Sequence, residues 1–376
     1  MIEYKKVFFS ILKSALWGTS FEVPHGFKEW REVCTLARSQ SVLGLVANFI
    51  LNAPELNQLL SDDLKLKLKR FVIGNFSTSQ MLNNALLKVV QALREHGIDP
   101  VLLKGQGIAK YYPVPELRQC GDIDIYVGAK NFEKSCEVIG ALSTPEDHTG
   151  DIPSLKHFHT KLGPASIEIH RYTDVYFPKR LDRIYQNISD DGMNSGQVVL
   201  DFSGVPVLTP SIDFNVFFIF NHFWHHFIAD GVGLRQICDW ALLLYHNQGK
   251  INLQYLESVL KQMRLFKEWK VFGYIAVNSL GLPAEEMPFY DPKCSKLAAM
   301  VLDLIMLEGN FGQENMKGHN RPKGYYAGKW YSFRKRFVRN LRVLRIFPIE
   351  ALRHLSKVFF IGVAVIFSDK FKLYQD

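Results

Sequence analysis

The chain has 376 residues, of which 47% are hydrophobic and 22% are charged. These values are ordinary for a globular protein and leave room for two or three domains with a sizeable core. The formal net charge of +8 favours an acidic partner, such as nucleic acid, a nucleotide or an anionic membrane, although many soluble proteins carry a similar charge.

The cysteines and the hydropathy pattern exclude several classes of protein. The five cysteines are scattered and none has CxxC spacing, which excludes a disulfide framework and a zinc ribbon and favours a reducing compartment. The N-terminal residues lack the long apolar stretch and the cleavage site of a signal peptide. The best candidate for a membrane span, Val358 to Phe367, is too short. We expect a cytoplasmic protein, with a peripheral position at the membrane as an alternative.

The first hundred residues are predicted to be largely helical. Apolar residues at helical spacing indicate short helices between about residues 3 and 60. Ser61 begins a capping sequence for a long helix from Leu64 to Glu95, and Gly97 follows it as a stop signal. We expect this helix to lead into the first strand and to pack against the domain that follows.

A short strand, a glycine-containing turn and a short helix come next. Val101 to Lys104 is predicted to be a buried strand, and Ile108 to Tyr112 a helix that ends before Pro113. Gly105 and Gly107 lie between them. Because glycine allows close approach of the backbone and a helix N-terminus offers free N–H groups, this order suits a phosphate site. The same turn is common without any chemical role, so it only supports other signals.

Two aspartates one residue apart are the centre of the pattern. Asp122 and Asp124 alternate with Ile123 and Ile125, so in a strand the carboxylates share one face and the isoleucines the other. Two carboxylates held close together repel each other, and a Mg²⁺ ion between them relieves the repulsion. For this motif alone, the solvated side of an edge strand is the more common explanation.

The segment that follows mixes strands and helices. The predicted elements are a helix (Asn131 to Leu142), a polar loop (Ser143 to Ser154), a hairpin (His157 to Leu162 and Ala165 to His170), a helix (Lys179 to Ile188) and a second hairpin (Gln197 to Phe202 and Val205 to Leu208). Elements in this order suit a small twisted sheet with helices on one face.

A third carboxylate lies in the first of these hairpins. Glu168 has an isoleucine on each side, so it shares a strand face with Ser166 and His170. Together with Asp122 and Asp124 it would form a two-metal constellation, which clamps the attacking and leaving oxygens of a phosphoryl or nucleotidyl displacement.

Helices predominate after Pro210, and the first of them is rich in histidine. Ser211 can cap a helix from Ile212 to Ile228. Within it His222 and His226 are four residues apart, a spacing that zinc sites use, with His225 between them. No acidic or cysteine ligand nearby completes such a site, so hydrogen-bonded histidines are the favoured interpretation. Further helices are predicted at Gly233 to Trp240, Leu253 to Met263, Phe266 to Leu280 and Ser295 to Leu307.

The C-terminal segment is strongly basic. Between Lys317 and Lys357 there are twelve Lys or Arg residues and one acidic residue, Glu350, and aromatic residues such as Trp330 are interspersed among them. This composition favours first a helix with a solvated basic face, then an amphipathic helix on an anionic membrane, and last a nucleic-acid contact.

Several of these motifs together resemble a known family. They are Leu103-Lys104-Gly105, Tyr112-Pro113, Arg118, Gly121-Asp122-Ile123-Asp124-Ile125 and Ile167-Glu168-Ile169-His170. The chain resembles an uncharacterised nucleotidyltransferase family of the DNA-polymerase-beta-like superfamily. The turn departs from the Gly-Ser or Gly-Gly of many members, because Lys104-Gly105-Gln106-Gly107 stands here. The resemblance implies an α+β fold with a small mixed sheet flanked by N-terminal and C-terminal helical regions.

The resemblance also implies a site. In it Asp122, Asp124 and Glu168 would be catalytic and bind Mg²⁺ or Mn²⁺, although Glu168 could instead be the base that deprotonates the acceptor. A nucleoside triphosphate (NTP) would be bound by Lys104, Gly105, Gln106, Arg118, Gly121, Arg235 and Asp239. Asp239 would orient Arg235 or accept a proton, or the two would form only a structural ion pair.

We therefore expect four regions: helices at 1–96, a nucleotidyltransferase core at 97–209, a helical bundle at 210–316 and a basic extension at 317–376. The expected activity is Mg²⁺-dependent transfer of a nucleoside monophosphate from an NTP to a small molecule, protein or RNA, with release of pyrophosphate. The alternative is a non-catalytic nucleotide-binding or scaffold protein that contacts a membrane or nucleic acid through residues 317–357. The acceptor, the base of the NTP and the oligomeric state remain open.

Overall fold

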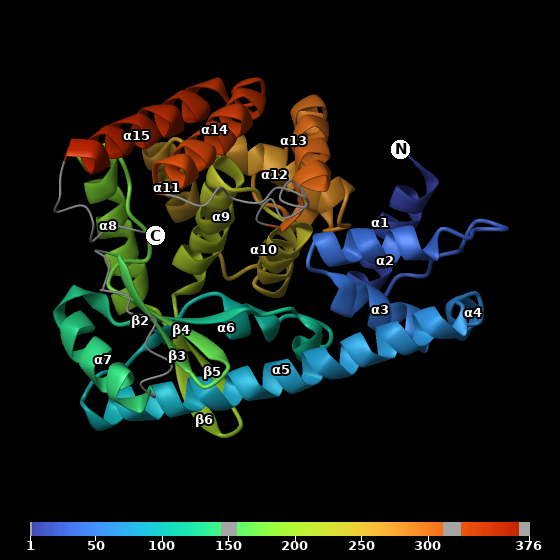
Figure 1. Cartoon of the computed structure of the whole chain (residues 1–376), viewed down its shortest axis with the longest axis horizontal. Helices are drawn as coiled ribbons and strands as arrows, with labels where there is room; N and C mark the ends of the chain where they lie inside the picture. The colour runs from blue at the N-terminus through green and yellow to red at the C-terminus, as the bar shows by residue number, and fades with distance from the viewer. Residues whose placement is uncertain (1, 144–155, 311–324, 368–376) are drawn as a thin grey trace.

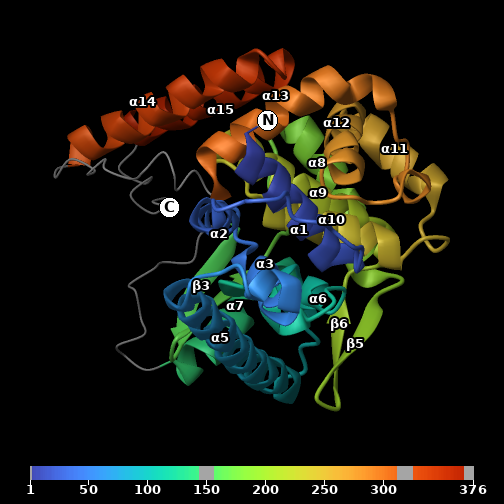
Figure 2. The ribbon, with the colours of Figure 1, turned by 90° about the vertical axis from the view of Figure 1, so that its right-hand side faces the viewer.

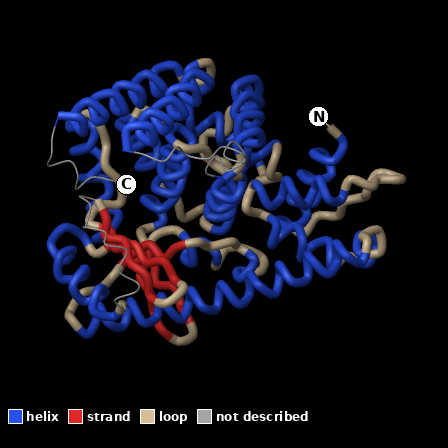
Figure 3. The backbone as a smooth tube through the Cα atoms, in the orientation of Figure 1, coloured by secondary structure: helices blue, strands red, loops and turns tan. Residues whose placement is uncertain are grey.

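The computed structural model describes residues 2–143, 156–310 and 325–367. Its fold is α+β, as expected: helices surround a mixed sheet of six strands (Figures 1 and 3). The polar loop predicted for residues 143–154 lies outside the described residues from residue 144 onward. The same is true of residues 317–324, at the start of the basic segment.

The elements follow one another along the chain in this order: α1 (Glu3–Trp17), α2 (Trp30–Ser39), α3 (Leu43–Asn52), α4 (Pro54–Asn57), α5 (Asp62–Glu95), β1 (Val101–Leu102), α6 (Gly105–Ala109), η1 (Pro115–Leu117), β2 (Asp122–Tyr126), α7 (Gly128–Leu142), β3 (His157–Leu162), β4 (Ala165–His170), α8 (Lys179–Asn194), β5 (Val198–Phe202), β6 (Val205–Thr209), α9 (Ile212–Ala229), α10 (Leu234–His246), α11 (Leu253–Met263), α12 (Phe266–Asn278), η3 (Ala284–Glu286), η4 (Pro292–Cys294), α13 (Ser295–Glu308), α14 (Tyr325–Leu344) and α15 (Pro348–Phe367).

The sheet has the strand order β3-β4-β2-β1-β6-β5. Both predicted hairpins are present, because β3 pairs with β4 and β5 with β6 in antiparallel fashion. The central strand β2 lies parallel to β4 and antiparallel to β1, and β1 lies parallel to β6. Two strands from distant parts of the chain, β2 and β4, are thus direct neighbours.

One face of the sheet is apolar and packs against helices. The isoleucines that alternate with the acidic residues point to this face, where α5 and α7 cover them (Figure 1). The buried residues of this core include Ile123, Ile125, Ile167, Ile169, Leu86, Val89, Phe132 and Ile139. Their burial removes the apolar half of each strand from water, so the polar half must face the other way.

The long helix α5 begins and ends as its sequence predicts. The Ser61 hydroxyl accepts a hydrogen bond from the Leu64 N–H, which satisfies one of the free donors of the first turn. Beyond its C-terminus Gly97 has a φ of +74°, which glycine adopts without strain. The second half of α5 packs on the sheet, as expected for a helix that leads into the first strand.

A second helical layer lies across the opposite face of the sheet. Helices α9 and α10 stand between the sheet and the C-terminal hairpin of α14 and α15 (Figures 1 and 2). Helix α9 begins as predicted, because Ser211 accepts a hydrogen bond from the Phe214 N–H. The sheet and these two helices enclose the candidate site.

A larger apolar core joins the N-terminal helices to the helices that follow the sheet. It contains residues of α1, α2 and α3 together with those of α9, α10, α12 and α13, and fully buried members include Phe8 and Trp240. The indole N–H of Trp17 donates to the Leu280 carbonyl oxygen at 2.6 Å. In the described parts of the chain, no helix has an apolar stretch of the length that a bilayer requires.

Candidate active site

The three predicted carboxylates come together because of the pairing of β2 with β4. In this parallel pair Asp124 lies opposite Glu168, and Asp122 lies opposite Ser166. Asp122, Asp124 and Glu168 each offer a carboxylate oxygen within 4.8 Å of the other two. Residues more than forty positions apart in the sequence thus form one acidic cluster, on the sheet face opposite the isoleucine core.

The carboxylates are held in a mostly buried environment. Asp124 is 1% exposed, and burial alone would raise its pKa, but Lys104 and His170 outweigh burial and hold the pKa of Asp124 below its usual range. The negative charge of Asp124, followed by burial, raises the pKa of Asp122. The cluster therefore contains strong carboxylate repulsion that a bound cation would relieve.

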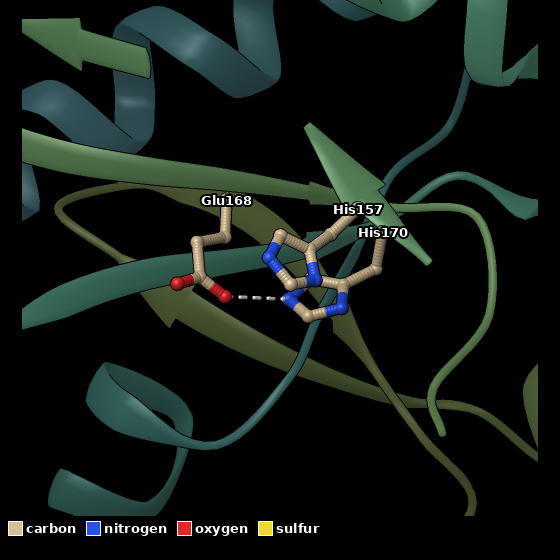
Figure 4. Close-up of side chains that lie close together, drawn as sticks. All are labelled: His157, Glu168 and His170. Atoms are coloured by element: carbon tan, nitrogen blue, oxygen red, sulfur yellow. Dashed lines mark ion pairs between the residues drawn. The ribbon is translucent and has the colours of Figure 1, made fainter. Parts of the chain in front are cut away.

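Lys104 and His170 both contact Asp124. The Lys104 ammonium lies 2.9 Å from Asp124 Oδ1, and His170 Nε2 donates to the same oxygen at 3.0 Å. His170 Nε2 also lies 3.3 Å from Glu168 Oε2 (Figure 4). Burial opposes protonation of His170, yet these two carboxylates raise the pKa of its imidazole above the usual value. His170 therefore bridges the acids of the two strands.

A tight turn places Lys104 and Gly105 beside the cluster. Lys104 has a φ of +33° and Gly105 a φ of +46°, so β1 ends at Leu102, two residues earlier than predicted. Helix α6 then begins at Gly105 and ends at Ala109, whereas the sequence predicted a helix from Ile108 to Tyr112. The prediction from the apolar pattern was wrong because the turn at Lys104 lets the helix start before that pattern does. The family resemblance implies that Gly105 opens the helix, and the structure confirms this start.

The site is a cavity of about 350 Å³ between the sheet and helices α9 and α10. This volume lies within the range of small-molecule sites. Its lining contains both charged and apolar residues, which come from the sheet core and from the helical bundle. The lining residues are Leu103, Lys104, Gly105, Arg118, Asp122, Asp124, Lys156, His157, Glu168, His170, Thr173, Phe218, Ile219, His222, Phe223, His226, Arg235, Gln236 and Asp239.

Arg118 lines the cavity, but its guanidinium is already engaged. Its Nε and Nη2 donate to Asp239 at 2.8 and 2.6 Å, and its Nη1 donates to Cys120 Sγ at 2.9 Å. Tyr112 donates its hydroxyl hydrogen to Asp239 at 2.6 Å. The phosphate contact of Arg118 therefore stays a prediction, for a guanidinium that Asp239 already holds and whose buried pair joins the core to α10.

The expected partnership of Asp239 with Arg235 is also wrong. Asp239 points to Arg118 and Tyr112, although it is four residues from Arg235 on one helix. Arg235 instead donates from Nη1 to the Gln119 carbonyl oxygen. It remains half-buried in the cavity wall, and its charge lowers the pKa of Asp122 in part. Tertiary packing across the cavity decided the pairing, not helical spacing.

The remaining predicted nucleotide contacts differ in position. Gly105 lines the cavity, whereas Gln106 and Gly121 are absent from its lining. Gln106 is 3% exposed, and neither polar atom of its side-chain amide has a hydrogen-bond partner among the described residues. Gly121 is exposed at the start of β2. A side-chain contact of Gln106 with a nucleotide in this cavity therefore has no support in the structure.

The histidines of α9 face the cavity or its edge. The rings of His222 and His226 are 4.5 Å apart, and His222 Nε2 lies 3.4 Å from the Lys104 ammonium. Burial, and then the charge of Lys104, lower the pKa of both imidazoles, that of His226 to about 4. His225 pairs with Asp174. Among the described residues these histidines belong to no group of three or more metal ligands.

Sequence reasoning missed several residues of the cavity. The cavity is also lined by Lys156, His157 and Thr173. The Lys156 ammonium forms an ion pair with Asp174 Oδ1 at 3.2 Å. His170 was placed on the right strand face but was given no role. The alternation of polar residues in His157-Phe158-His159 was the available signal, because it predicts that both histidines share the face of Glu168.

Comparisons with known proteins identify the family of the chain. No curated protein matches the chain. Among solved structures, an antigenic nucleotidyltransferase-like protein from Paracoccidioides brasiliensis is similar, with 14% sequence identity and a TM-score of 0.32 over 56% of this chain and 97% of that chain. A family model described as uncharacterised nucleotidyltransferase matches residues 28–280, which include the sheet, the acidic cluster and the cavity. The chain therefore belongs to this uncharacterised nucleotidyltransferase family.

Proposed function

We propose that the protein is a Mg²⁺-dependent nucleotidyltransferase that transfers a nucleoside monophosphate from an NTP to an acceptor and releases pyrophosphate. The observation that carries the proposal is the convergence of Asp122, Asp124 and Glu168 in a cavity that several charged side chains line. Membership of the family supports nucleotidyl transfer in general. The metal, the NTP and the acceptor belong to the proposal.

The acidic cluster fits a hard divalent cation. Mg²⁺ prefers oxygen ligands and binds through one or two carboxylates together with substrate phosphates. Asp122, Asp124 and Glu168 supply such oxygens from two strands whose register holds them in place. The ion, when bound, would neutralise charge on the phosphates and polarise the reacting phosphorus centre. Residues 122, 124 and 168 would hold it.

The charge of the cavity favours an NTP bound together with metal ions. Lys104, Arg118, Lys156 and Arg235 line it, and four acidic residues, Asp122, Asp124, Glu168 and Asp239, cancel their formal charge. An NTP carries about four negative charges, and divalent ions normally neutralise them in such sites. A neutral cavity of this kind therefore suits an NTP with its cations better than the free nucleotide.

The basic residues have different parts in this proposal. Lys104 and Arg235 line the cavity and would stabilise negative charge on the phosphates. Arg118 acts as a positioning residue, because Asp239 takes up its charge. The side chain of Glu168 is 23% exposed, and its pKa is lowered by His170 against the effect of burial. It remains a candidate for either metal ligand or base.

The direct test is incubation with α-³²P-labelled NTPs and Mg²⁺, with transfer to a cell extract as the acceptor pool. We expect labelled product from the unaltered protein and a loss of about a hundredfold or more in Asp122→Asn and Asp124→Asn, because each removes a charge that holds the ion. Glu137→Gln, on the exposed side of α7, is the matched control and should retain activity. No transfer to any acceptor, with no Mg²⁺-dependent nucleotide binding, would contradict the proposal.

We propose a second function for the C-terminal hairpin, contact with an anionic lipid surface. The observation that favours it is a set of exposed apolar residues on α14 and α15, with exposed arginines interspersed among them in the sequence. The apolar residues are Trp330, Phe337, Val338, Leu341, Ile349 and Leu352, and the arginines are Arg334, Arg336, Arg342 and Arg345. Apolar residues flanked by arginine are typical of helices that lie in a membrane interface.

Vesicle cosedimentation tests the lipid contact. The protein should bind phosphatidylcholine vesicles that contain phosphatidylglycerol, and bind those of phosphatidylcholine alone much more weakly. The double variant Trp330→Ser/Leu341→Ser should lose binding, whereas Ile73→Ser, which removes an exposed apolar residue of α5, should not. Binding to RNA without binding to vesicles would support the nucleic-acid alternative and refute the lipid contact.

A further inference from the structure

A second group of metal-ligating atoms adjoins the acidic cluster. His157 on β3, and Glu168 and His170 on β4, each offer one ligand atom within 4.8 Å of the other two. Figure 4 shows the two imidazole rings and the carboxylate pointing toward one another. Glu168 belongs to both groups, so its carboxylate links the two histidines to the two aspartates.

The backbone of the β3–β4 hairpin determines this arrangement. His157 and His170 are direct partners in the antiparallel pair, and Glu168 precedes His170 by two residues on the same face. The two imidazole rings have centroids 5.4 Å apart and planes 43° apart. Because all three residues lie on paired strands rather than on loops, little conformational entropy remains to be lost when they bind a ligand.

The observed spacing is that of two ligands on one ion. His170 Nε2 and Glu168 Oε2 are 3.3 Å apart. Ligands about 2.1 Å from a common ion lie roughly 3.0 Å apart in octahedral geometry and about 3.4 Å apart in tetrahedral geometry. His170 Nε2 now joins Asp124 and Glu168 as a hydrogen-bond donor, and an ion on Nε2 would hold the carboxylates together in place of the proton.

The two groups suit different metals. Imidazole nitrogen is a good ligand for Zn²⁺, Co²⁺ and other transition metals, whereas Mg²⁺ binds oxygen and retains water. A pair of imidazoles with one carboxylate is a ligand set that Zn²⁺ uses when it keeps a position open for substrate. In two-metal sites the ions are about 3.5–4 Å apart, a separation that a shared carboxylate can span.

We propose that His157, Glu168 and His170 bind a divalent transition-metal ion, such as Zn²⁺, next to the ion held by the aspartates. The site then has two unlike positions, one of oxygen ligands for Mg²⁺ and one with nitrogen ligands that selects a transition metal. This inference deepens the proposed function, because the second ion would face the same cavity, but the binding of the metal itself does not depend on catalysis.

Co²⁺ is the probe, because Co²⁺ with nitrogen ligands absorbs visible light, and its affinity can be measured by calorimetry. We expect His157→Ala to weaken Co²⁺ binding by about tenfold or more and to abolish the visible band, since even the loss of a residue that only supports a ligand costs that much. His159→Ala is the matched control. His159 lies on the same strand and face, but its Nε2 contacts Ser166 Oγ at 2.8 Å and it is not in the group. The His159→Ala variant should bind Co²⁺ with the same affinity as the unaltered protein.

Unchanged Co²⁺ affinity and spectrum in His157→Ala would overturn the inference. Circular dichroism shows whether the His157→Ala variant is folded. If that variant does not fold, His157→Gln, which keeps a polar side chain, takes its place. Asp122→Asn separates this site from the proposed function: it should lose nucleotidyl transfer and keep the Co²⁺ band. An unaltered protein that shows the band but transfers no nucleotide would keep the metal site and refute the proposed function.

Discussion

The backbone of Lys104 has a φ of +33° and a ψ of −144°, a conformation that residues with a Cβ rarely adopt. The conformation turns the chain between β1 and α6, and the ammonium lies 2.9 Å from Asp124 Oδ1. Burial by itself would lower the pKa of Lys104, but Asp124, Asp122 and Glu168 raise it, so the side chain stays charged. Strain at a residue that contacts the site is typical of functional positions.

Substitution can separate the strain of Lys104 from its charge. Lys104→Ala and Lys104→Gly both remove the ammonium, but only glycine relieves the positive φ, so we expect the Gly variant to be more stable by about 1 kcal/mol. Urea unfolding measures the difference. Lys110 is the control, because its φ of −57° is helical. There Lys110→Ala should be more stable than Lys110→Gly. Equal stability of the two Lys104 variants would show that the turn carries no strain.

A second residue, Glu268 on α12, is buried outside the lining of the cavity. It is 2% exposed, and its Oε2 has no hydrogen-bond partner among the described residues. Burial, with a contribution from the charge of Glu350, raises the pKa of Glu268 to about 7. Because the folded state favours the protonated form, ionisation of this carboxyl destabilises the fold.

The pH dependence of stability follows from this shift. The protonated Glu268 carboxyl contributes to the free energy of unfolding. This contribution is fully retained below the unfolded pKa of about 4.5 and is lost as the pH rises through the folded pKa of about 7. Glu268→Gln, which cannot ionise, should therefore be more stable than the unaltered protein at pH 8, by about 2 to 3 kcal/mol, and have little effect at pH 4.5. Urea unfolding at the two pH values measures it. An equal gain in stability at pH 4.5 and at pH 8 would contradict the raised pKa of Glu268.

At the scale of elements, one buried ion pair joins the sheet core to the helical bundle. Arg118 follows η1 and Asp239 lies on α10, and their side chains are 5% and 6% exposed. Tyr112, just after α6, adds a third contact to the same carboxylate. Two charges removed from water in this way are costly unless each remains paired, so the pair constrains how α10 lies against the core.

Loss of one partner should be more harmful than loss of both. We expect Arg118→Met to destabilise the protein by about 3 kcal/mol or more, since it leaves the Asp239 charge buried, and Arg118→Met/Asp239→Leu to recover much of the loss. The exposed pair of Lys261 and Glu257 on α11 is the control, and Lys261→Met should cost less than about 0.5 kcal/mol. Thermal unfolding compares the variants. Additive effects in the double variant would show that the two side chains act independently.

For the whole molecule, the shared core implies that its two ends are stabilised together. Phe8 of α1 and Trp240 of α10 belong to one apolar core and are both fully buried. Trp17 adds a hydrogen bond from the end of α1 to the Leu280 carbonyl oxygen. Helices α1 and α10 lie on either side of the sheet segments in the sequence, but they pack into the same core in space.

A cavity at Phe8 tests this coupling. Phe8→Ala should destabilise the protein by about 3 to 5 kcal/mol. Because the core is continuous, urea transitions followed by tryptophan fluorescence and by far-ultraviolet circular dichroism should shift together. The exposed Phe76 on α5 serves as control, and Phe76→Ala should shift neither transition by much. Separate transitions for the two signals would show that the N-terminal helices unfold independently.

Much of the local structure could be predicted from the sequence because its causes are local. The hairpin of β3 and β4, the cap of Ser61 on α5 and the start of α9 at Ser211 follow from alternation, turn residues and capping, which act over a few positions. Helix α6 was misplaced, because the positive φ of Lys104 has no sequence signature in a residue other than glycine. The partner of Asp239 was also missed, because a helical spacing of four does not show which side chain lies across the cavity.

The sequence by itself determined which residues could be acidic ligands, since alternation in β2 and β4 places Asp122, Asp124 and Glu168 opposite their isoleucines. Only the tertiary structure decided that they meet, because the parallel pairing of β2 with β4 joins segments that are distant along the chain. It also decided that His157 and His170 adjoin them and that Arg118 is neutralised by Asp239. Strand register and packing are properties of the whole fold, and no local pattern encodes them.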